Sequence, residues 1–220
     1  AHSSQSSGNK KCHCWIPVAT HKAITILSSG LPSAAAELNR QAAEETPVHI
    51  PTHLPECILR PWRQSDQAGL IRNANNRKVW RNLTHLFPHP YTEADAQHWL
   101  RFANEESRSL HLAIEFKGAA AGGIGTIAGE GIAAATADFG YWLGEPFWGQ
   151  GIATAAASAL VGRLMGEHRF SRLQAPVFAW NPASMRVLEK VGFVREGVLR
   201  SSVTKDGALI DSVMYAYTAA

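Results

Sequence analysis

The sequence predicts an α+β protein, and three of its segments carry that prediction. An apolar, strand-like stretch at residues 139–143 runs into a glycine-rich turn and then into an Ala-rich segment of helical composition, residues 155–165. Asn181-Pro182 and Gly192 have the residue types that start and end a helix. Two strand-like segments near the C-terminus flank Lys205-Asp206-Gly207, a tight-turn sequence typical of a hairpin.

The remaining elements follow from local periodicity and capping residues. Ser65 is expected to cap a short helix that ends near Arg72. Thr92 caps the next helix with Asp95 at the capping-box position, and its buried stripe is Ala96, Trp99, Leu100 and Ala103. Residues 75–86 are expected to be helical or irregular. Strands are predicted at residues 58–62, 111–116, 123–128, 133–143, 173–179, 193–203 and 209–217, and further helices at 150–166 and 181–192.

Residues 1–55 differ from the rest of the chain and are predicted to be an N-terminal extension that is partly disordered. Its first residues are rich in Ser, Gly and Asn. Residues 33–45 favour a short helix, and the three prolines of residues 46–55 favour an extended linker. Residues 56–220 are predicted to form the functional domain.

Composition excludes several classes of function. The chain has 220 residues, 45% of them hydrophobic, and a formal charge of +3, so no dense basic surface for nucleic acid is expected. No apolar run is long enough to span a membrane, and no secretory leader is expected. The cysteines, Cys12, Cys14 and Cys57, form neither a disulfide pattern nor a finger-type metal site, so we expect no metal and a cytoplasmic location.

The glycine-rich turn, residues 148–154, is the most informative feature for function. It lies between a predicted strand and a predicted helix, with Gly149 and Gly151 inside the turn. Backbone N–H groups at such a turn point at one place, and the positive end of the helix dipole lies behind them. The turn therefore predicts a site for an anion, most often a phosphate.

The glycine turn and the segment 181–193 together resemble the acetyl-CoA-binding core of the GNAT superfamily of N-acetyltransferases. The resemblance runs from about residue 58 to 217. Three further strings resemble the RimJ/RimL branch: Leu59-Arg60-Pro61-Trp62, Phe87-Pro88-His89-Pro90-Tyr91-Thr92 and Gly140-Tyr141-Trp142-Leu143. The resemblance implies a GNAT fold, in which helices flank a central, mostly antiparallel, twisted sheet.

The resemblance also implies where acetyl-CoA would bind. The pyrophosphate would lie on the turn and the pantetheine arm along the preceding strand, where a backbone N–H would serve as the oxyanion donor. The implied cofactor-binding residues are Tyr141, Trp142, Leu143, Trp148, Gly149, Gln150, Gly151, Ile152, Ala153, Thr154 and Asn181. Two readings of the Trp142 side chain stay open, core or site, and Asn181 also reads as an ordinary helix cap. Two residues depart from the family pattern: Trp148 replaces Gln or Arg, and Ala155 replaces a frequent Glu.

Catalytic roles are implied for Ser184 and Asp138. Ser184 would protonate the CoA thiolate, as a Ser does in the RimL branch, because Leu188 occupies the position of the Tyr used elsewhere in the superfamily. Asp138 would be the general base, with Glu115, His89 and His111 as weaker alternatives. The competing readings are a first-turn hydroxyl for Ser184 and a solvated carboxylate for Asp138.

The expected function is transfer of an acetyl group from acetyl-CoA to a primary amine in a ternary complex. The acceptor would be a protein or peptide N-terminus or a small amine, without nucleic acid or membrane as partners. One alternative is a CoA-binding module with little turnover, which the residues Ala155 and Leu188 permit. Another is an interaction protein whose extension docks a partner, and homodimer formation stays open.

Overall fold

The structure, a computed structural model, describes residues 48–105 and 109–219. Its strands are β1 (Ile50–Pro51), β2 (Cys57–Pro61), β3 (Ser109–Phe116), β4 (Ala119–Ala128), β5 (Thr136–Leu143), β6 (Arg172–Phe178), β7 (Val194–Lys205) and β8 (Ala208–Thr218). The α-helices are α2 (Gln67–Ala74), α3 (Arg77–Trp80), α4 (Glu93–Glu105), α5 (Ile152–Gly166) and α6 (Pro182–Val191), and short 3-10 turns are η1 (Gln64–Asp66), η2 (Gly131–Ala133) and η3 (Glu145–Phe147). The α+β class is confirmed.

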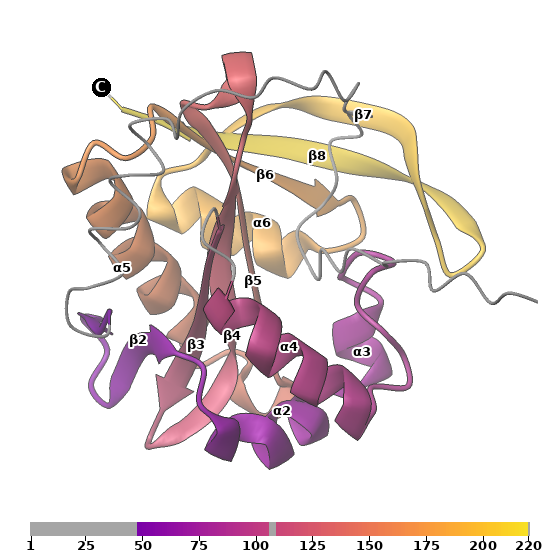
Figure 1. The fold of residues 1–220 in the computed structure, drawn as a ribbon. Coiled ribbons are helices and arrows are strands. Elements are labelled where there is room, and N and C mark those ends of the chain that lie inside the picture. The colour runs from indigo at the N-terminus through magenta and orange to yellow at the C-terminus, as the bar shows by residue number, and fades with distance from the viewer. Residues whose placement is uncertain (1–47, 106–108, 220) are drawn as a thin grey trace, which may run out of the picture.

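All eight described strands join one sheet in the order β1-β2-β3-β4-β5-β6-β8-β7 (Figure 1). Neighbouring strands are antiparallel except β5 and β6, which are parallel. This parallel pair is short: residues 136–138 pair with residues 172–174, and no described strand pairs with the rest of β5 on that side. The two strands therefore separate after three residue pairs and leave a gap between two parts of the sheet.

Two apolar cores lie on the two faces of the sheet. One core holds the buried residues of α5 and α6, including Ile152, Leu160 and Leu188, together with Phe139 of β5. The other holds α2 and α4 together with Trp62 and Trp142. Because side chains alternate along a strand, β5 contributes Phe139 to one core and Trp142 to the other.

Helix α4 confirms the predicted cap and stripe. The N–H of Thr92 donates to Oδ2 of Asp95 over 2.8 Å, and the N–H of Asp95 donates to Oγ1 of Thr92 over 3.3 Å. The four stripe residues, Ala96, Trp99, Leu100 and Ala103, are all buried. Spacing of three and four residues places them on one side of the helix, and burial of that side holds α4 on the sheet.

Two predictions near the start of the domain were wrong. Ser65 does not cap a helix: it lies inside η1, and the carboxylate of Asp66 accepts from the N–H of Arg63 over 2.8 Å. The segment predicted as a linker is partly strand, because β1 pairs with β2 and Ile50 is buried in the core. The predicted helix at 33–45 and the predicted disorder of the extension lie outside the described residues.

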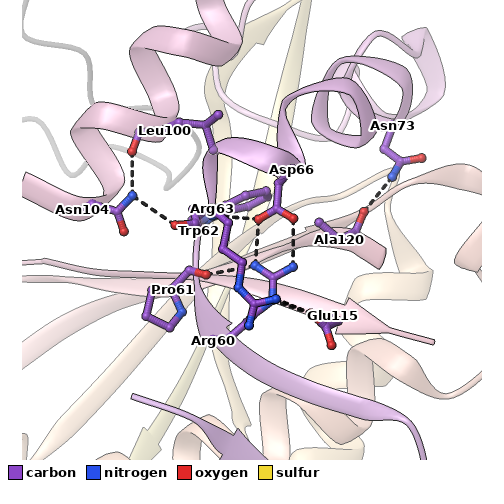
Figure 2. Close-up of polar contacts among 10 residues, drawn as sticks. All are labelled: Arg60, Pro61, Trp62, Arg63, Asp66, Asn73, Leu100, Asn104, Glu115 and Ala120. Atoms are coloured by element: carbon purple, nitrogen blue, oxygen red, sulfur yellow. Dashed lines mark hydrogen bonds and ion pairs between the residues drawn. The ribbon is translucent and has the colours of Figure 1, made fainter. Parts of the chain in front are cut away.

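Asp66 is paired with a buried arginine, Arg60, whose charge it neutralises (Figure 2). Arg60 is 1% exposed, and its guanidinium contacts Asp66 through two parallel hydrogen bonds of 2.7 and 2.8 Å. Its Nε donates to Glu115 of β3, and its Nη1 also donates to the carbonyl of Pro61. A buried charge must be paired in this way to be tolerated. The network ties β2, β3 and η1 together.

The C-terminal hairpin confirms its predicted turn. Asp206 and Gly207 have φ of 54° and 76°, and Lys205 pairs with Ala208 across the turn. Left-handed conformation at both central residues is the signature of a two-residue hairpin turn. Among the described helices, none has the length and apolarity needed to cross a membrane.

Candidate active site

A cavity of about 390 Å³ lies where β5 and β6 separate. Its walls are the unpaired end of β5, the end of β6, the start of α5, one side of α6 and residues 79–84. Both parts of the sheet and the glycine turn therefore contribute to its walls. Because no described strand pairs with this end of β5 on the cavity side, backbone groups that face away from β4 are available to a bound molecule.

The glycine turn forms one end of this cavity. Gly149 and Gly151 have φ of 74° and 77°, a left-handed conformation that residues with a Cβ adopt only under strain. Gly151 is the N-cap of α5 and no side chain caps this helix, while the side chain of Gln150 donates to the carbonyl of Pro146 over 2.8 Å. The first N–H groups of α5, at Ile152, Ala153 and Thr154, therefore keep their donor capacity for a ligand.

Two cations that the sequence analysis missed lie at the same cavity. Arg186 and Lys190 both line it and both are exposed. They are four residues apart on α6, so they share one helix side. That spacing, on the helix that begins after the Asn181 cap, was the available signal. With the α5 N-terminus, these two side chains make this end of the cavity attractive to a multiply charged anion.

Trp148, which departs from the family pattern, has a structural role. Its indole Nε1 donates to the carbonyl of Leu143 over 2.9 Å. The bond fixes the path from β5 into the glycine turn. Ala155, the other departure, is fully buried, so a Glu in its place would have to bury a carboxylate.

Backbone alternation along β5 decides which amide faces the cavity. The N–H of Gly144 donates to Ala121 of β4, whereas the carbonyl of Leu143 faces away from β4 and accepts from Trp148. Successive residues of a strand direct their backbone groups to opposite sides. The backbone of Tyr141 therefore faces the cavity, and that of Trp142 faces β4. The Trp142 side chain is 4% exposed and packs against Phe87, so it belongs to the core.

Tyr141 and Ser184 meet at the cavity wall, a contact that the sequence analysis did not foresee. The Tyr141 hydroxyl oxygen lies 2.8 Å from Oγ of Ser184 and donates within 3.2 Å of the Ser184 carbonyl. Burial raises the pKa of Tyr141 well above its usual range, and the hydrogen bond to Ser184 opposes that shift only in part. Asn181 caps α6 as predicted, because its Oδ1 accepts from the Ser184 N–H over 3.2 Å. All three residues line the cavity.

Asp138 does not line the cavity with them. It lies on β5 three residues before Tyr141, so its side chain projects from the opposite face of the sheet. Its Oδ1 accepts from Nε2 of Gln174 over 2.8 Å. Burial raises the pKa of Asp138, and the Gln174 hydrogen bond opposes the shift. A role for Asp138 as base stays a prediction that needs the acceptor to approach from that face.

The weaker base candidates have other partners. Glu115 accepts from the buried Arg60, and His111 is 3% exposed between the rings of Trp99 and Phe102. His89 is exposed and packs against Trp80. In the part of the chain that the structure describes, no group of His, Cys, Asp and Glu side chains could hold a metal ion, while Cys12 and Cys14 lie outside it.

The model of the family described as "Acetyltransferase (GNAT) domain" matches residues 56–194, which is more than half of the chain. The chain therefore belongs to the GNAT acetyltransferase family. The match includes the glycine turn, the cavity strands β5 and β6, and α6.

Curated relatives match over a shorter region. The Bacillus subtilis protein named "Probable N-acetyltransferase YjcK" is 41% identical over 76 residues, which cover 34% of this chain and 42% of that protein. The ribosomal-protein-serine acetyltransferase of Escherichia coli is 35% identical over 81 residues, which cover 37% of this chain and 45% of that protein. The chain thus spans less than half the length of these relatives.

Solved structures are similar over most of the described chain. RimJ of Mycobacterium smegmatis, in complex with CoA-disulfide, is 28% identical with a TM-score of 0.69 and covers 79% of this chain and 88% of its own. RimL, a ribosomal L7/L12 α-N-protein acetyltransferase in complex with coenzyme A, is 23% identical with a TM-score of 0.69 and covers 78% and 98%. The second likeness concerns the fold alone. The predicted RimJ/RimL-like GNAT fold is therefore confirmed.

Proposed function

We propose that this protein binds acetyl-CoA in the cavity between β5 and β6 and transfers the acetyl group to a primary amine. The observation that carries the proposal is the uncapped, glycine-built start of α5, which opens into the same cavity as the unpaired edge of β5. A diphosphate at the first and a pantetheine arm along the second would satisfy backbone donors that the fold leaves available. The likeness to RimJ, whose structure contains a CoA derivative, supports the same ligand.

The catalytic assignment follows from which groups face the bound thioester. The Tyr141 N–H would donate to the carbonyl oxygen as negative charge develops there. Ser184 would protonate the leaving thiolate, and Asn181 would hold the start of α6 and contact the pantetheine arm. Trp142 would contribute backbone shape rather than a donor, because its N–H faces β4, whereas the Leu143 N–H faces the same side as that of Tyr141 and would be a second donor. Arg186 and Lys190 would add to the phosphate contacts of residues 149–154.

The acceptor is best sought among amines of low pKa. An α-amino group with a pKa near 8 loses about 1 kcal/mol to protonation at pH 7, and a lysine side chain about 4.6 kcal/mol. Among the described residues that line the cavity, none carries a carboxylate, and Asp138 lies outside it. A site with so weak a base favours a protein or peptide N-terminus. The name of the similar Escherichia coli enzyme supports a protein acceptor.

Thermal protection by CoA tests the ligand. CoA at a hundredfold excess over Kd should stabilise the folded protein by about 2.7 kcal/mol. Acetyl-CoA should then acetylate at least one member of a panel of peptides with different N-terminal residues and of small amines, measured by mass spectrometry. Protection without transfer would leave the second candidate, a CoA-binding module, which the absence of a cavity carboxylate favours. No protection at millimolar CoA would contradict both.

A further inference from the structure

The contact between Tyr141 and Ser184 joins two elements that the sequence keeps apart. Tyr141 extends from β5 and Ser184 lies in the first turn of α6. Their hydroxyl oxygens are 2.8 Å apart, and the Tyr141 hydroxyl also lies 3.2 Å from the Ser184 carbonyl. Both residues line the cavity, so the pair is accessible to a molecule bound there.

We propose that Tyr141 is a positioning residue for the leaving group: it directs the Ser184 hydroxyl hydrogen into the cavity. The proposal rests on the proposed acetyl-CoA function. A serine hydroxyl has one hydrogen and can accept two hydrogen bonds. When the Tyr141 O–H donates to Oγ of Ser184, the serine hydrogen cannot return to Tyr141 along the same line. It is then available to a third atom, and the cavity is where such an atom would lie.

The Tyr141 hydroxyl has two acceptors within reach on Ser184, so the pair can change its hydrogen bonds at little cost. The Tyr141 O–H can instead donate to the Ser184 carbonyl, which leaves the Ser184 hydroxyl to donate to Tyr141. Both states keep Tyr141 hydrogen-bonded, as a buried hydroxyl requires. A negatively charged sulfur in the cavity would favour the state in which Ser184 donates outward, because a charge-assisted hydrogen bond is the stronger one.

Burial limits what Tyr141 itself can do. Since burial raises the pKa of Tyr141, its hydroxyl stays protonated and acts as a hydrogen-bond donor rather than as a proton source. In the transfer, the C–N bond forms, the C–S bond breaks, and the electron pair goes to the sulfur. The sulfur takes the Ser184 proton, and Ser184 regains a proton from water at the cavity mouth. The proton lost by the amine leaves to water, so the step is balanced.

The test is the pKa of the CoA thiol when bound, followed by thiolate absorbance against pH. Tyr141→Phe removes one oxygen and keeps the ring. We expect it to raise the bound thiol pKa and to lower kcat about tenfold, the effect of one hydrogen bond. The Kd of CoA should change less than about twofold. In a Ser184→Ala background, Tyr141→Phe should have no further effect, since Tyr141 acts through Ser184.

Tyr215→Phe is the matched control. Tyr215 also reaches from a strand to α6, where its hydroxyl donates to Glu189 over 2.7 Å, but it does not line the cavity. Its loss should lower stability without moving the thiol pKa or kcat. The inference is wrong if Tyr141→Phe leaves the thiol pKa unchanged, or if the two substitutions add. Failure of the wild-type protein to bind CoA would overturn the proposed function and this inference together. Binding without amine transfer would overturn only transfer, since the thiol titration still decides the role of Tyr141.

Discussion

Two polar clusters, one on each side of the sheet, use their hydrogen bonds in different ways. Around Arg60, the guanidinium donates four hydrogen bonds, to Asp66, Glu115 and Pro61, and the side chain is 1% exposed. At the cavity, Tyr141 and Ser184 share hydrogen bonds that can be rearranged. The Arg60 guanidinium is buried and uses four of its five N–H groups on other protein atoms, so its cluster stabilises the fold. The Tyr141–Ser184 pair lines the cavity, so a donor that it frees can also act on a ligand.

The largest expected effect comes from the cluster at Arg60. Arg60→Met should lower the free energy of unfolding by about 3–5 kcal/mol, because it leaves the carboxylates of Asp66 and Glu115 without their buried cation. Chemical denaturation measures this. Arg101→Met on the exposed side of α4 is the control and should change stability by less than about 0.5 kcal/mol. Equal effects of the two substitutions would show that the buried Arg60 contributes no more to stability than an exposed arginine.

Gly151→Glu should have the next largest effect, on binding rather than on folding. A carboxylate at the start of α5 would repel the CoA phosphates, and the left-handed φ of 77° would add strain of about 1–2 kcal/mol. We expect CoA affinity to fall more than about a hundredfold by calorimetry, with the protein still folded. The control is Gly162→Glu, which adds the same charge on the exposed side of the same helix. Retained CoA affinity in the Gly151 variant would remove the phosphate-site argument.

Ser184→Ala should lower turnover more than affinity. If Ser184 supplies the proton to the thiolate, kcat should fall about tenfold to a hundredfold, while the Kd of CoA stays within about twofold. Steady-state kinetics and calorimetry on the same preparation separate the two. Since Asn181 caps the helix by accepting from the Ser184 backbone N–H, the substitution leaves that cap in place. Unchanged turnover would reduce Ser184 to a first-turn hydroxyl.

The smallest expected effect concerns Lys205, a buried lysine that belongs to neither cluster. Its Nζ lies 3.6 Å from the Trp80 ring centroid and donates to the Thr84 carbonyl over 3.3 Å, while the neighbouring Asp206 pairs with Arg77. Burial lowers the pKa of Lys205 to about 8 from 10.5, against the opposing effect of Asp206. Between these values the unfolded chain binds more protons than the folded one, so this residue makes stability rise with pH.

Comparison with Lys205→Met isolates this pH effect. Below about pH 8 the ammonium is charged in both states, and the full cost of its burial is present. The difference in unfolding free energy, wild type minus variant, should therefore grow in favour of the wild type from pH 8 to 10. Denaturation series at several pH values measure it. A difference that does not change with pH would show that the lysine is as well solvated as in the unfolded chain.

Local signals predicted the fold where a few neighbouring residues decide the structure. The capping box of Thr92, the cap at Asn181 and the turn at Asp206-Gly207 all formed as expected, because each depends on residues within one turn. Ser65 was misread because its neighbour Asp66 is held by Arg60. Strand β1 was missed because Pro51 pairs at the edge of the sheet, where a proline is tolerated.

The site was predictable in its backbone and not in its side-chain pairings. The glycine turn and the strand before it could be identified because positive φ and helix starts have sequence signatures. No signature relates Tyr141 to Ser184, since their contact depends on how β5 leaves β6. The opposite facing of Asp138 and Tyr141 was available in the sequence, because residues three apart on a strand project from opposite faces. Arg186 and Lys190 had a visible spacing, but only the packing of α6 brings them to the phosphate end.

The early separation of β5 from β6 places the cavity between two parts of the sheet that few backbone hydrogen bonds connect. Among the described residues, the backbone hydrogen bonds that join the β1–β5 part of the sheet to the β6–β8 part are confined to residues 135–138 and 171–174. A ligand whose amide groups lie along the free edge of β5 would occupy the place of a missing strand. It would then connect the two parts of the sheet, and the amide hydrogens of β5 and β6 should exchange more slowly when it is bound.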